Sequence, residues 1–150
     1  MKEAEGNGRW RERGTSPGAR RTVLFLDSNE TVRFVAGTVL EKGGYRVLLA
    51  AGAAEGIAVA EREGDAIDAI VSDIDWPGMD GLEVRDAIRQ RWPGIPFVFL
   101  SAAQLDPIYL GAIAREGIHF VPKPFSARQL LAAVEKAAGK WVLGSCLRSF

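Results

Sequence analysis

Apolar runs alternate with helix-like stretches along most of this chain, and that alternation restricts the fold more than any other feature of the sequence. The apolar runs, each short enough for one strand, cover residues 22–27, 45–50, 66–73, 95–101 and 118–123. Helix-like stretches occupy residues 30–42, 53–63, 82–91, 107–116 and 126–138. Strands that alternate with helices predict a parallel sheet covered by helices on both faces. We therefore expect an α/β fold with a doubly wound, five-stranded parallel sheet.

The ends of several predicted helices carry residues that satisfy free backbone groups. Gly43 follows the first helical stretch, at a position where glycine commonly ends a helix. Asp80 with Glu83, and Ser126 with Gln129, have the spacing of a capping box, in which each side chain bonds the backbone N–H of the other residue. These signals support helix starts shortly after Asp80 and Ser126.

The composition divides the chain into three segments. Residues 1–21 are rich in glycine and charge and nearly free of apolar side chains, so they bury too little surface to offset the entropy of ordering, and we expect a disordered N-terminal arm. Residues 22–138 contain all the predicted strands and helices and form the domain. Residues 139–150 are a C-terminal tail that either packs on the domain or forms a short element of its own.

Length, charge and cysteine content exclude several classes of protein. A chain of 150 residues suffices for one domain with its own core. The formal net charge is +0, which gives no argument for a nucleic-acid or membrane-surface partner, and no apolar run approaches the ~18 residues of a membrane span. The single cysteine cannot form an internal disulfide and the N-terminus lacks a secretory signal, so we expect a cytoplasmic protein.

Polar side chains stand at the ends of four apolar runs. Asp27 closes the first run and Asp73 the third. Ser101 closes the fourth and Lys123 the fifth. The carboxyl ends of parallel strands meet at one edge of the sheet, which is where open α/β sheets bind their ligands. We therefore expect two carboxylates, a hydroxyl and an ammonium group to converge there.

This combination of groups suits phosphoryl transfer. Carboxylates bind Mg²⁺ through hard oxygen ligands, and a carboxylate can also be the nucleophile that forms an acyl phosphate. A metal ion and a lysine can neutralise the transferring phosphoryl group, and a hydroxyl can hydrogen-bond one of its oxygens. A strand end can also be polar simply because it meets water, but four such residues on one edge favour a functional site.

Three motifs at these strand ends resemble those of one protein family. The segment DIDWPGMDGLEV (73–84) is similar to the phosphoacceptor loop of response-regulator receiver domains. SA (101–102) is similar to their Ser/Thr-Ala step, and KPF (123–125) to their Lys-Pro-Phe motif. The resemblance covers residues 22 to about 138. It implies a flavodoxin-like sheet with the strand order 2-1-3-4-5.

The resemblance also implies roles for individual residues. Asp73 corresponds to the phosphoacceptor and Lys123 to the cation that balances the phosphoryl charge. The Lys123–Pro124 peptide bond is expected to be cis. Ser101 corresponds to the hydroxyl that turns toward the phosphoryl group, and Phe120 to the aromatic switch residue that turns inward with it.

A Mg²⁺ site is implied as well, with one departure from the family's pattern. Asp27 matches the first acid of that site, Asp73 is shared with it, and Asp75 would offer its backbone carbonyl. The family usually has a second acid directly after the first, where this chain has the neutral Ser28, followed by Asn29. Metal affinity depends on the charge of the ligands, so we expect Ser28 to weaken Mg²⁺ binding.

Two functions remain open from the sequence. The first is a phosphoacceptor switch that receives a phosphoryl group from a histidine kinase or a phosphotransfer protein, with no enzyme activity beyond self-catalysed phosphoryl transfer and autodephosphorylation. The second is a degenerate receiver that docks proteins without phosphorylation, which Ser28 and Asn29 favour. A flavin-binding carrier of similar fold is disfavoured because no Gly- or Thr-rich phosphate loop follows the first strand.

Output is expected through protein contacts at the face of the fourth helix, fifth strand and fifth helix, which many members of the family use. Helical spacing puts Leu110, Ile113 and Ala114 on a stripe that can face the core. Ile108 and Tyr109 would then form an exposed apolar patch for a homodimer or a downstream protein. The C-terminal tail is the alternative cover for that patch.

Overall fold

The computed structural model describes residues 20–76, 79–101, 107–116 and 118–149, and its centre is a parallel sheet. The five strands are β1 (Thr22–Leu26), β2 (Arg46–Ala50), β3 (Ala69–Asp73), β6 (Phe97–Ser101) and β7 (His119–Pro122). They lie in the order β2-β1-β3-β6-β7, and every neighbouring pair is parallel. If only the strands of this sheet are numbered along the chain, β6 and β7 become the fourth and fifth strands and the order is 2-1-3-4-5. The expected α/β, flavodoxin-like topology is therefore confirmed.

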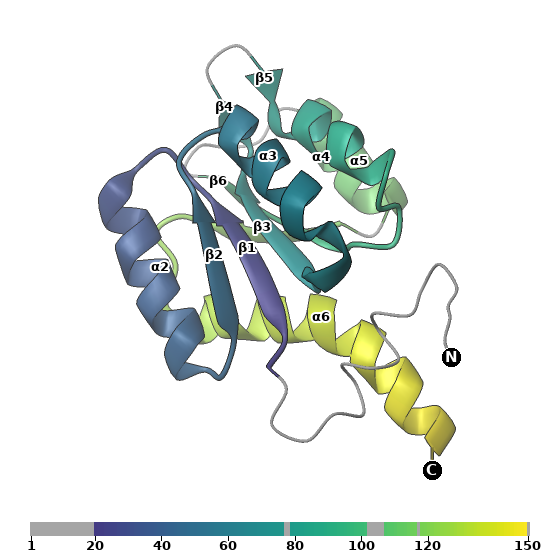
Figure 1. Ribbon diagram of the computed structural model, residues 1–150. Coiled ribbons are helices and arrows are strands. Elements are labelled where there is room, and N and C mark those ends of the chain that lie inside the picture. Colours follow the sequence, from purple (N-terminus) through teal and green to yellow (C-terminus); the bar gives the residue numbers. More distant parts are fainter. Residues whose placement is uncertain (1–19, 77–78, 102–106, 117, 150) are drawn as a thin grey trace.

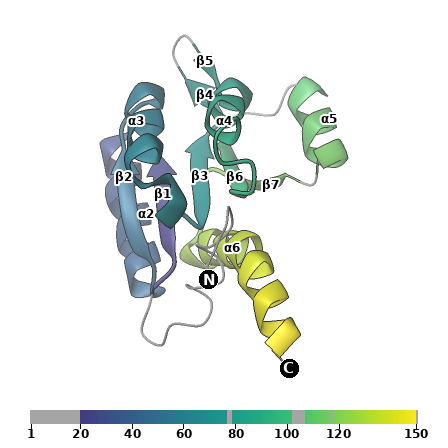
Figure 2. The ribbon, with the colours of Figure 1, turned by 45° about the vertical axis from the view of Figure 1, so that its right-hand side comes forward.

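Helices cover both faces of the sheet (Figure 1). One face carries α2 (Glu30–Lys42) and α6 (Ala127–Ser149), and the other carries α3 (Ala53–Glu63) and α4 (Gly81–Arg89). A further helix, α5 (Pro107–Glu116), stands at the β7 end of the sheet (Figure 2). Within the described residues, none of the helices is long and apolar enough to cross a membrane.

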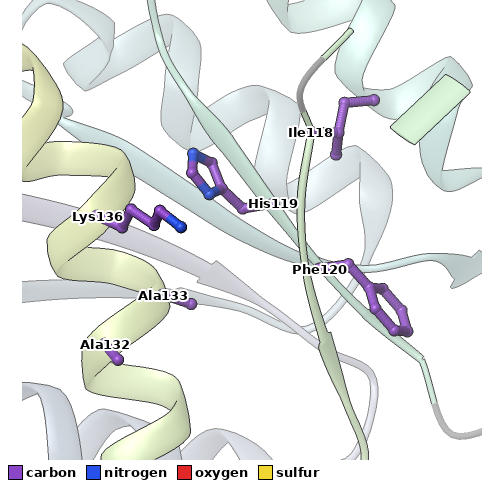
Figure 3. A pocket seen from close by; sticks show the side chains of 6 residues that line it. All are labelled: Ile118, His119, Phe120, Ala132, Ala133 and Lys136. Atoms are coloured by element: carbon purple, nitrogen blue, oxygen red, sulfur yellow. The ribbon is translucent and has the colours of Figure 1, made fainter. Parts of the chain in front are cut away.

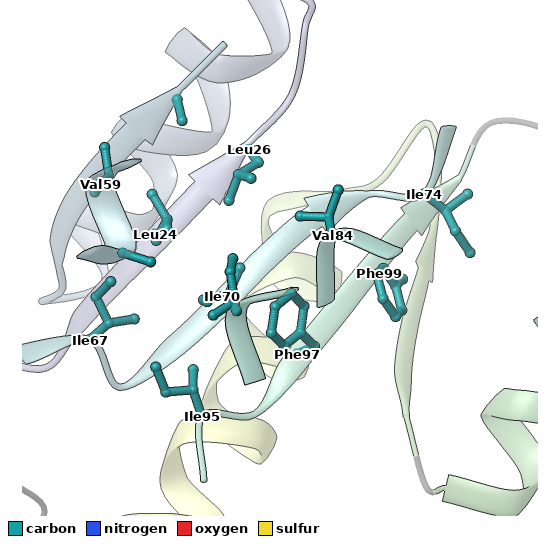
Figure 4. Packing of buried hydrophobic residues seen from close by; sticks show 13 residues of the cluster. Leu24, Leu26, Val59, Ile67, Ile70, Ile74, Val84, Ile95, Phe97 and Phe99 are labelled. Atoms are coloured by element: carbon teal, nitrogen blue, oxygen red, sulfur yellow. The ribbon is translucent and has the colours of Figure 1, made fainter. Parts of the chain in front are cut away.

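Alternate residues of the central strands supply two apolar layers. On β1, Leu24 and Leu26 belong to the layer under α3 and α4. Val23 and Phe25 belong to the layer under α2 and α6, and all four side chains are fully buried. Figure 4 shows the first layer, in which residues of β1, β3 and β6 pack with those of α3 and α4. Burial of one large apolar side chain contributes about 1.5–3 kcal/mol, so the two layers make the sheet a firm base for the loops at its edge.

Side chains and glycines at the helix ends explain where the helices start and stop. Asn29 caps α2 by accepting a hydrogen bond from the Val32 backbone N–H at 3.0 Å, which holds the turn that follows β1. Gly44, just after this helix, has a φ of 98°, a conformation that favours glycine. The predicted capping box of α6 is confirmed, because the Ser126 N–H donates to Gln129 Oε1 at 2.8 Å and the Gln129 N–H donates to Ser126 Oγ at 3.0 Å.

Several strands are shorter than the apolar runs that predicted them. β3 begins at Ala69 rather than at 66, because Gly64–Ala66 forms a 3₁₀ turn, η1. The strands expected from 95 and 118 begin at Phe97 and His119. Ile95 is fully buried although it precedes β6, so apolar character extends beyond the paired backbone and overstates the strand length.

The C-terminal segment is helical rather than a separate tail. α6 continues past Ala138 to Ser149, so the expected helix end near 138 was wrong. Residues 139–149 contain no proline, and their glycines lower helix propensity without ending the helix. In Figure 1 this part of α6 extends beyond the sheet toward the C-terminus.

The stripe of α5 that was expected to face the core is partly exposed. Leu110 is 52% exposed and Ala114 is also exposed, so the expectation was wrong for both residues. Figure 2 shows α5 standing away from the sheet, which leaves this side of the helix in solvent. Outside the described part lie the side chains of Ile108, Tyr109 and Ile113, and residues 1–19 of the predicted arm at 1–21.

Two glycine substitutions test how tightly α4 and α2 pack. A Cβ at Gly81 would lie 2.8 Å from the Ile74 Cα, so Gly81→Ala must move backbone in the loop after β3. A Cβ at Gly37, inside α2, would meet Leu49 at an ordinary 3.6 Å, so Gly37→Ala should only raise helix propensity. We expect Gly81→Ala to lower the free energy of unfolding by about 1–3 kcal/mol and Gly37→Ala to raise it by up to about 1 kcal/mol. Urea unfolding measures both changes, and shifts of the same sign would contradict this packing.

Candidate functional site

The carboxyl ends of four neighbouring strands bring the predicted polar residues to one edge of the sheet. Asp27 follows the last residue of β1, and Asp73 ends β3. Ser101 ends β6, and Lys123 comes directly after β7. The Lys123 backbone N–H donates to the Ser101 carbonyl oxygen at 2.8 Å, which continues the pairing of β6 and β7 to this edge. The convergence expected from the strand ends is therefore present.

One ammonium group connects two buried carboxylates at this edge. Lys123 Nζ lies 2.6 Å from Asp27 Oδ2 and 3.2 Å from Asp73 Oδ2. Asp27 is 1% exposed and Asp73 is 9% exposed, and the lysine side chain is itself mostly buried. Water screens charges in such a place weakly, so this ion cluster holds the ends of β1, β3 and β7 together.

The charge state of Lys123 follows from opposing effects. Burial alone would lower its pKa, because a low-dielectric environment disfavours the ammonium form. The close contact with Asp27 and the negative charges of Asp73 and Asp27 outweigh burial, so the pKa of Lys123 is raised above its usual value. The lysine is therefore a cation at neutral pH and can face an anionic group.

Main-chain contacts fix Asp27 and leave one of its oxygens poorly satisfied. Its N–H donates to the Ala50 carbonyl oxygen at 3.1 Å, and its Oδ1 accepts from the Asn29 N–H at 2.8 Å. Its Oδ2 is buried close to the Lys123 ammonium, yet within the described residues it accepts no well-aligned hydrogen bond. A buried acceptor in this state is a ready ligand for a cation.

Arg33 is a contact of this site that the sequence reasoning missed. Its Nη1 donates to the Asp27 carbonyl oxygen at 2.7 Å, so the half-buried guanidinium near the start of α2 ties this helix to the end of β1. The available signal was spacing, since a basic residue six positions after a strand-end acid falls in the following helix, close to that strand end. Nothing in the sequence alone indicated which backbone atom it would reach.

The loop after β3 is held by main-chain hydrogen bonds. The Ile74 N–H donates to the Leu100 carbonyl oxygen at 2.9 Å, and the Gly81 N–H donates to the Ile74 carbonyl oxygen at 2.8 Å. Between these contacts lies a short hairpin of β4 (Asp75–Trp76) and β5 (Met79–Asp80), which the sequence did not predict because two-residue strands leave no periodic pattern. Asp75, expected to offer its carbonyl oxygen, therefore begins this hairpin; the side chains of residues 75–80 lie outside the described part.

The other predicted residues lie around the ion cluster. Ser28 is exposed at the start of the loop after β1. Ser101 is buried, and the Lys123–Pro124 peptide bond is cis, as expected. Phe120 is half-buried against the layer under α3 and α4, and Figure 3 shows it pointing away from α6. These positions are compatible with the expected roles, which stay predictions.

A groove of ≈ 460 Å³ lies between β7 and α6, on the face expected to carry output (Figure 3). It is lined by Ile118, His119, Phe120, Ala132, Ala133 and Lys136. His119 points toward α6 from β7, which is an edge strand of the sheet. The small alanine side chains of α6 leave the groove open, and Lys136 gives it a positive charge.

The oxygen ligands at this site suit Mg²⁺, but its two carboxylates provide less negative charge than three acids would. Within the described residues there is no group of three or more acidic, histidine or cysteine side chains that could hold a metal ion. Mg²⁺ usually binds through one or two carboxylates together with waters and phosphate oxygens, and Asp27 and Asp73 can supply those carboxylates. The poorly satisfied Oδ2 of Asp27 is the feature that supports the fit.

Similar proteins are known at the levels of family, sequence and structure. The family model for the response regulator receiver domain matches residues 23–135. The chain is 33% identical over 129 residues to the sensor kinase CckA of Brucella abortus, covering 86% of this chain and 14% of that protein. The solved receiver domain of the hybrid histidine kinase CckA is 30% identical, with a TM-score of 0.65 over 78% of this chain and 98% of that one. The chemotaxis protein CheY4 of Vibrio cholerae is 26% identical, with a TM-score of 0.71 over 79% of this chain and 99% of that one.

A doubly wound sheet with two acids, a hydroxyl and a lysine at its carboxyl edge defines a receiver-type signalling domain. The family model covers most of the chain, and the chain belongs to the response regulator receiver domain family. The curated relatives are longer, since the chain spans 14% of CckA and 24% of the response regulator FleR of Pseudomonas aeruginosa. The similarity therefore concerns one segment of each relative.

Removal of the bridging cation tests the ion cluster. Lys123→Met leaves two buried carboxylates without their counter-charge, and we expect the free energy of unfolding at neutral pH to fall by roughly 3 kcal/mol. Because the pKa of Lys123 is raised in the folded state, its stabilising effect is complete below the pKa of an unfolded lysine, about 10.4, and is lost as the pH rises through the folded-state value.

Urea unfolding from neutral to strongly alkaline pH measures this effect. The stabilities of the parent chain and of Lys123→Met should converge as the lysine loses its proton. Lys136→Met, at an exposed lysine, is the control and should follow the parent at every pH. A gap between the parent and Lys123→Met that stays constant into the alkaline range would show that lost packing, rather than charge, causes the difference.

Proposed function

We propose that this domain is a phosphoacceptor switch, in which Asp73 takes a phosphoryl group from a histidine kinase or a phosphotransfer protein and the phosphorylated form acts through protein contacts. The pair of buried carboxylates bridged by Lys123 carries this proposal. A purely structural ion pair needs one acid for one lysine. Here a second acid is present, next to a buried hydroxyl and at the sheet edge where such folds bind ligands.

The geometry supports Asp73 as the nucleophile. One of its carboxylate oxygens would attack the phosphorus atom of a phosphohistidine, so that an O–P bond forms while the P–N bond breaks and its electron pair stays on the imidazole. Asp73 is less deeply buried than Asp27, which favours it as the acid that meets a donor. Lys123 Nζ, 3.2 Å from Asp73 Oδ2, would then face the phosphoryl oxygens and balance their charge.

Ser101 and Phe120 would couple phosphorylation to output. Ser101 is buried at the end of β6, beside β7, and its hydroxyl can donate a hydrogen bond to a phosphoryl oxygen on Asp73. That bond would draw the end of β6 toward Asp73. Phe120 lies half-buried on β7, paired with Phe99 of β6, and is the aromatic side chain able to follow this movement.

Bound Mg²⁺ would supply further neutralisation of the phosphoryl charge. Asp27 and Asp73 would hold the ion through carboxylate oxygens and Asp75 through its backbone carbonyl, while Ser28 adds no charge. The chain itself orients these donors, because Arg33 and the main-chain contacts fix Asp27, and hydrogen bonds around Ile74 fix the loop beyond Asp73.

Output through the face of α5, β7 and α6 is supported by the groove of ≈ 460 Å³ beside β7. β7 is an edge strand, and the groove combines apolar side chains with the positive charge of Lys136. A downstream protein, or a second copy of the chain, that presents an acidic group next to an apolar side chain would suit this groove.

A docking domain that works without phosphorylation is the second candidate. Ser28 favours it, because the site has one acid fewer than receivers usually carry. Lys123 also already balances part of the charge of Asp27 and Asp73. In a docking domain of this kind, the groove beside β7 would be open to a partner whether or not Asp73 is phosphorylated.

Labelling with acetyl phosphate tests the proposed acceptor. The parent chain should form an acyl phosphate that hydroxylamine removes, and Asp73→Asn should lose nearly all of the label because an amide is not a nucleophile for this reaction. Asp86→Asn, at an exposed carboxylate of α4, is the matched control and should be labelled like the parent. Undiminished label in Asp73→Asn would place the acceptor elsewhere, and a folded parent chain that is never labelled would favour the docking candidate.

A restored acid at position 28 tests the metal site. Ser28→Asp should tighten Mg²⁺ binding roughly tenfold, because affinity rises with the number of charged ligands. A Mg²⁺ titration followed by tryptophan fluorescence gives the affinity. Asn29→Asp adds the same charge one residue further along and keeps a capping side chain, so it should have a smaller effect. No tightening in Ser28→Asp, or equal tightening in both variants, would contradict a ligand role for position 28.

A further inference from the structure

Arg33 carries a positive charge that no acid neutralises in the part of the chain that the structure describes. Its Nη1 donates to the Asp27 carbonyl oxygen at 2.7 Å, so its hydrogen bond goes to a neutral main-chain group. None of the ion pairs between described residues includes Arg33, and Glu30, which lies three positions earlier on α2, is exposed and forms no ion pair with it. The Arg33 side chain is half-buried, so water screens its charge only in part.

The guanidinium group of Arg33 lies beside the ion cluster. The carbonyl oxygen and the carboxylate of Asp27 belong to one residue and are at most about 5 Å apart. The hydrogen bond of 2.7 Å therefore places Arg33 Nη1 within about 8 Å of the carboxylate that would hold Mg²⁺. This separation is no longer than the distance over which physiological salt screens exposed charges, and partial burial weakens that screening. The charge of Arg33 therefore acts on the ligands of the proposed metal site.

Arg33 changes the charge balance of the site. Asp27 and Asp73 bring two negative charges, and Lys123 and Arg33 bring two positive ones. At position 28, where an acid would add a third negative charge, the chain has the neutral Ser28. Such a site has little net charge with which to attract a divalent cation. An incoming phosphoryl group, by contrast, brings negative charge that the two side-chain cations can balance.

We propose that Arg33 is a second cation built into this site, which lowers the affinity for Mg²⁺ and supplies part of the charge balance that the metal provides during phosphoryl transfer to Asp73. This role rests on the proposed phosphoacceptor function, and it acts through the electrostatic field rather than through contact with the phosphoryl group. When acetyl phosphate reacts, an O–P bond forms at Asp73 while the bond to acetate breaks and its electron pair leaves with the acetate ion. The charge of Arg33 stabilises the negative charge that this step brings to the site, whether or not a metal ion is bound.

A Mg²⁺ titration of the unphosphorylated full chain, followed by tryptophan fluorescence, tests the effect on the metal. Arg33→Gln removes the charge but keeps an N–H donor for the Asp27 carbonyl oxygen, and it should tighten Mg²⁺ binding about fivefold because a unit charge at this distance no longer repels the ion. Arg33→Lys keeps the charge and should bind Mg²⁺ like the parent chain. Arg62→Gln is the control, because Arg62 is exposed in the last turn of α3, at the opposite edge of the sheet, and it should leave the affinity unchanged.

The direction of the change separates charge from structure. If Arg33 only held Asp27 in place, its replacement would loosen the metal site, so an Arg33→Gln chain that binds Mg²⁺ no better than the parent would overturn the proposal. Equal tightening in Arg62→Gln would also overturn it, since the effect would then be one of overall charge. Circular dichroism checks that each variant is folded.

Labelling with acetyl phosphate in EDTA, compared with labelling in saturating Mg²⁺, tests the contribution to phosphoryl transfer. Arg33→Gln should be labelled about fivefold more slowly than the parent chain in EDTA and at nearly the parent rate in Mg²⁺, because the metal then replaces the missing charge. A parent chain that is not labelled under either condition would overturn the phosphoacceptor function, while the Mg²⁺ titration would still decide whether Arg33 opposes the metal. Equal labelling rates of the parent and Arg33→Gln in EDTA would overturn the role of Arg33 in the transfer.

Discussion

The ammonium group of Lys123, held between the carboxylates of Asp27 and Asp73, is the contact on which the rest of the site depends. Two acids buried at one sheet edge would repel each other if no cation stood between them. With the lysine in place, attraction to the ammonium group offsets that repulsion. The same contact joins the ends of β1, β3 and β7. The positions of the site residues and the alignment of these strand ends therefore depend on each other.

This arrangement requires the sheet topology that carries it. Only the order β2-β1-β3-β6-β7 makes β1, β3 and β6 adjacent inner strands and brings β7 next to β6, so that four strand ends present their side chains to one region. The two apolar layers leave few ways for the strands to shift, since sliding one strand by a residue would turn its buried side chains to the opposite face. The site therefore rests on strands that the core holds in register. The two edges of the sheet are β2 and β7.

Most of the fold and the site residues could be predicted from the sequence, because both follow from local rules. Apolar runs that alternate with capped helices imply a parallel sheet, and the rule that its strand ends meet was enough to group Asp73 with Lys123. The rest depends on tertiary contacts that have no local signal. The exposure of Leu110 results from where α5 stands, and the bond from Arg33 to the end of β1 depends on how α2 packs. α6 continues past Ala138 because no proline follows to end it, and the lack of a stop signal does not by itself predict how far a helix extends.

The central claim is that Asp73 is the nucleophile of this ion cluster, and chemical trapping of the acyl phosphate tests it most directly. Borohydride reduces an aspartyl phosphate to homoserine, so a chain phosphorylated with acetyl phosphate, reduced and digested would carry the change at one aspartate position. We predict homoserine at position 73, in the peptide that follows β3, and at no other aspartate. Homoserine at Asp27 or Asp75 instead, or unmodified Asp73 in a chain whose phosphorylation is independently demonstrated, would contradict the account.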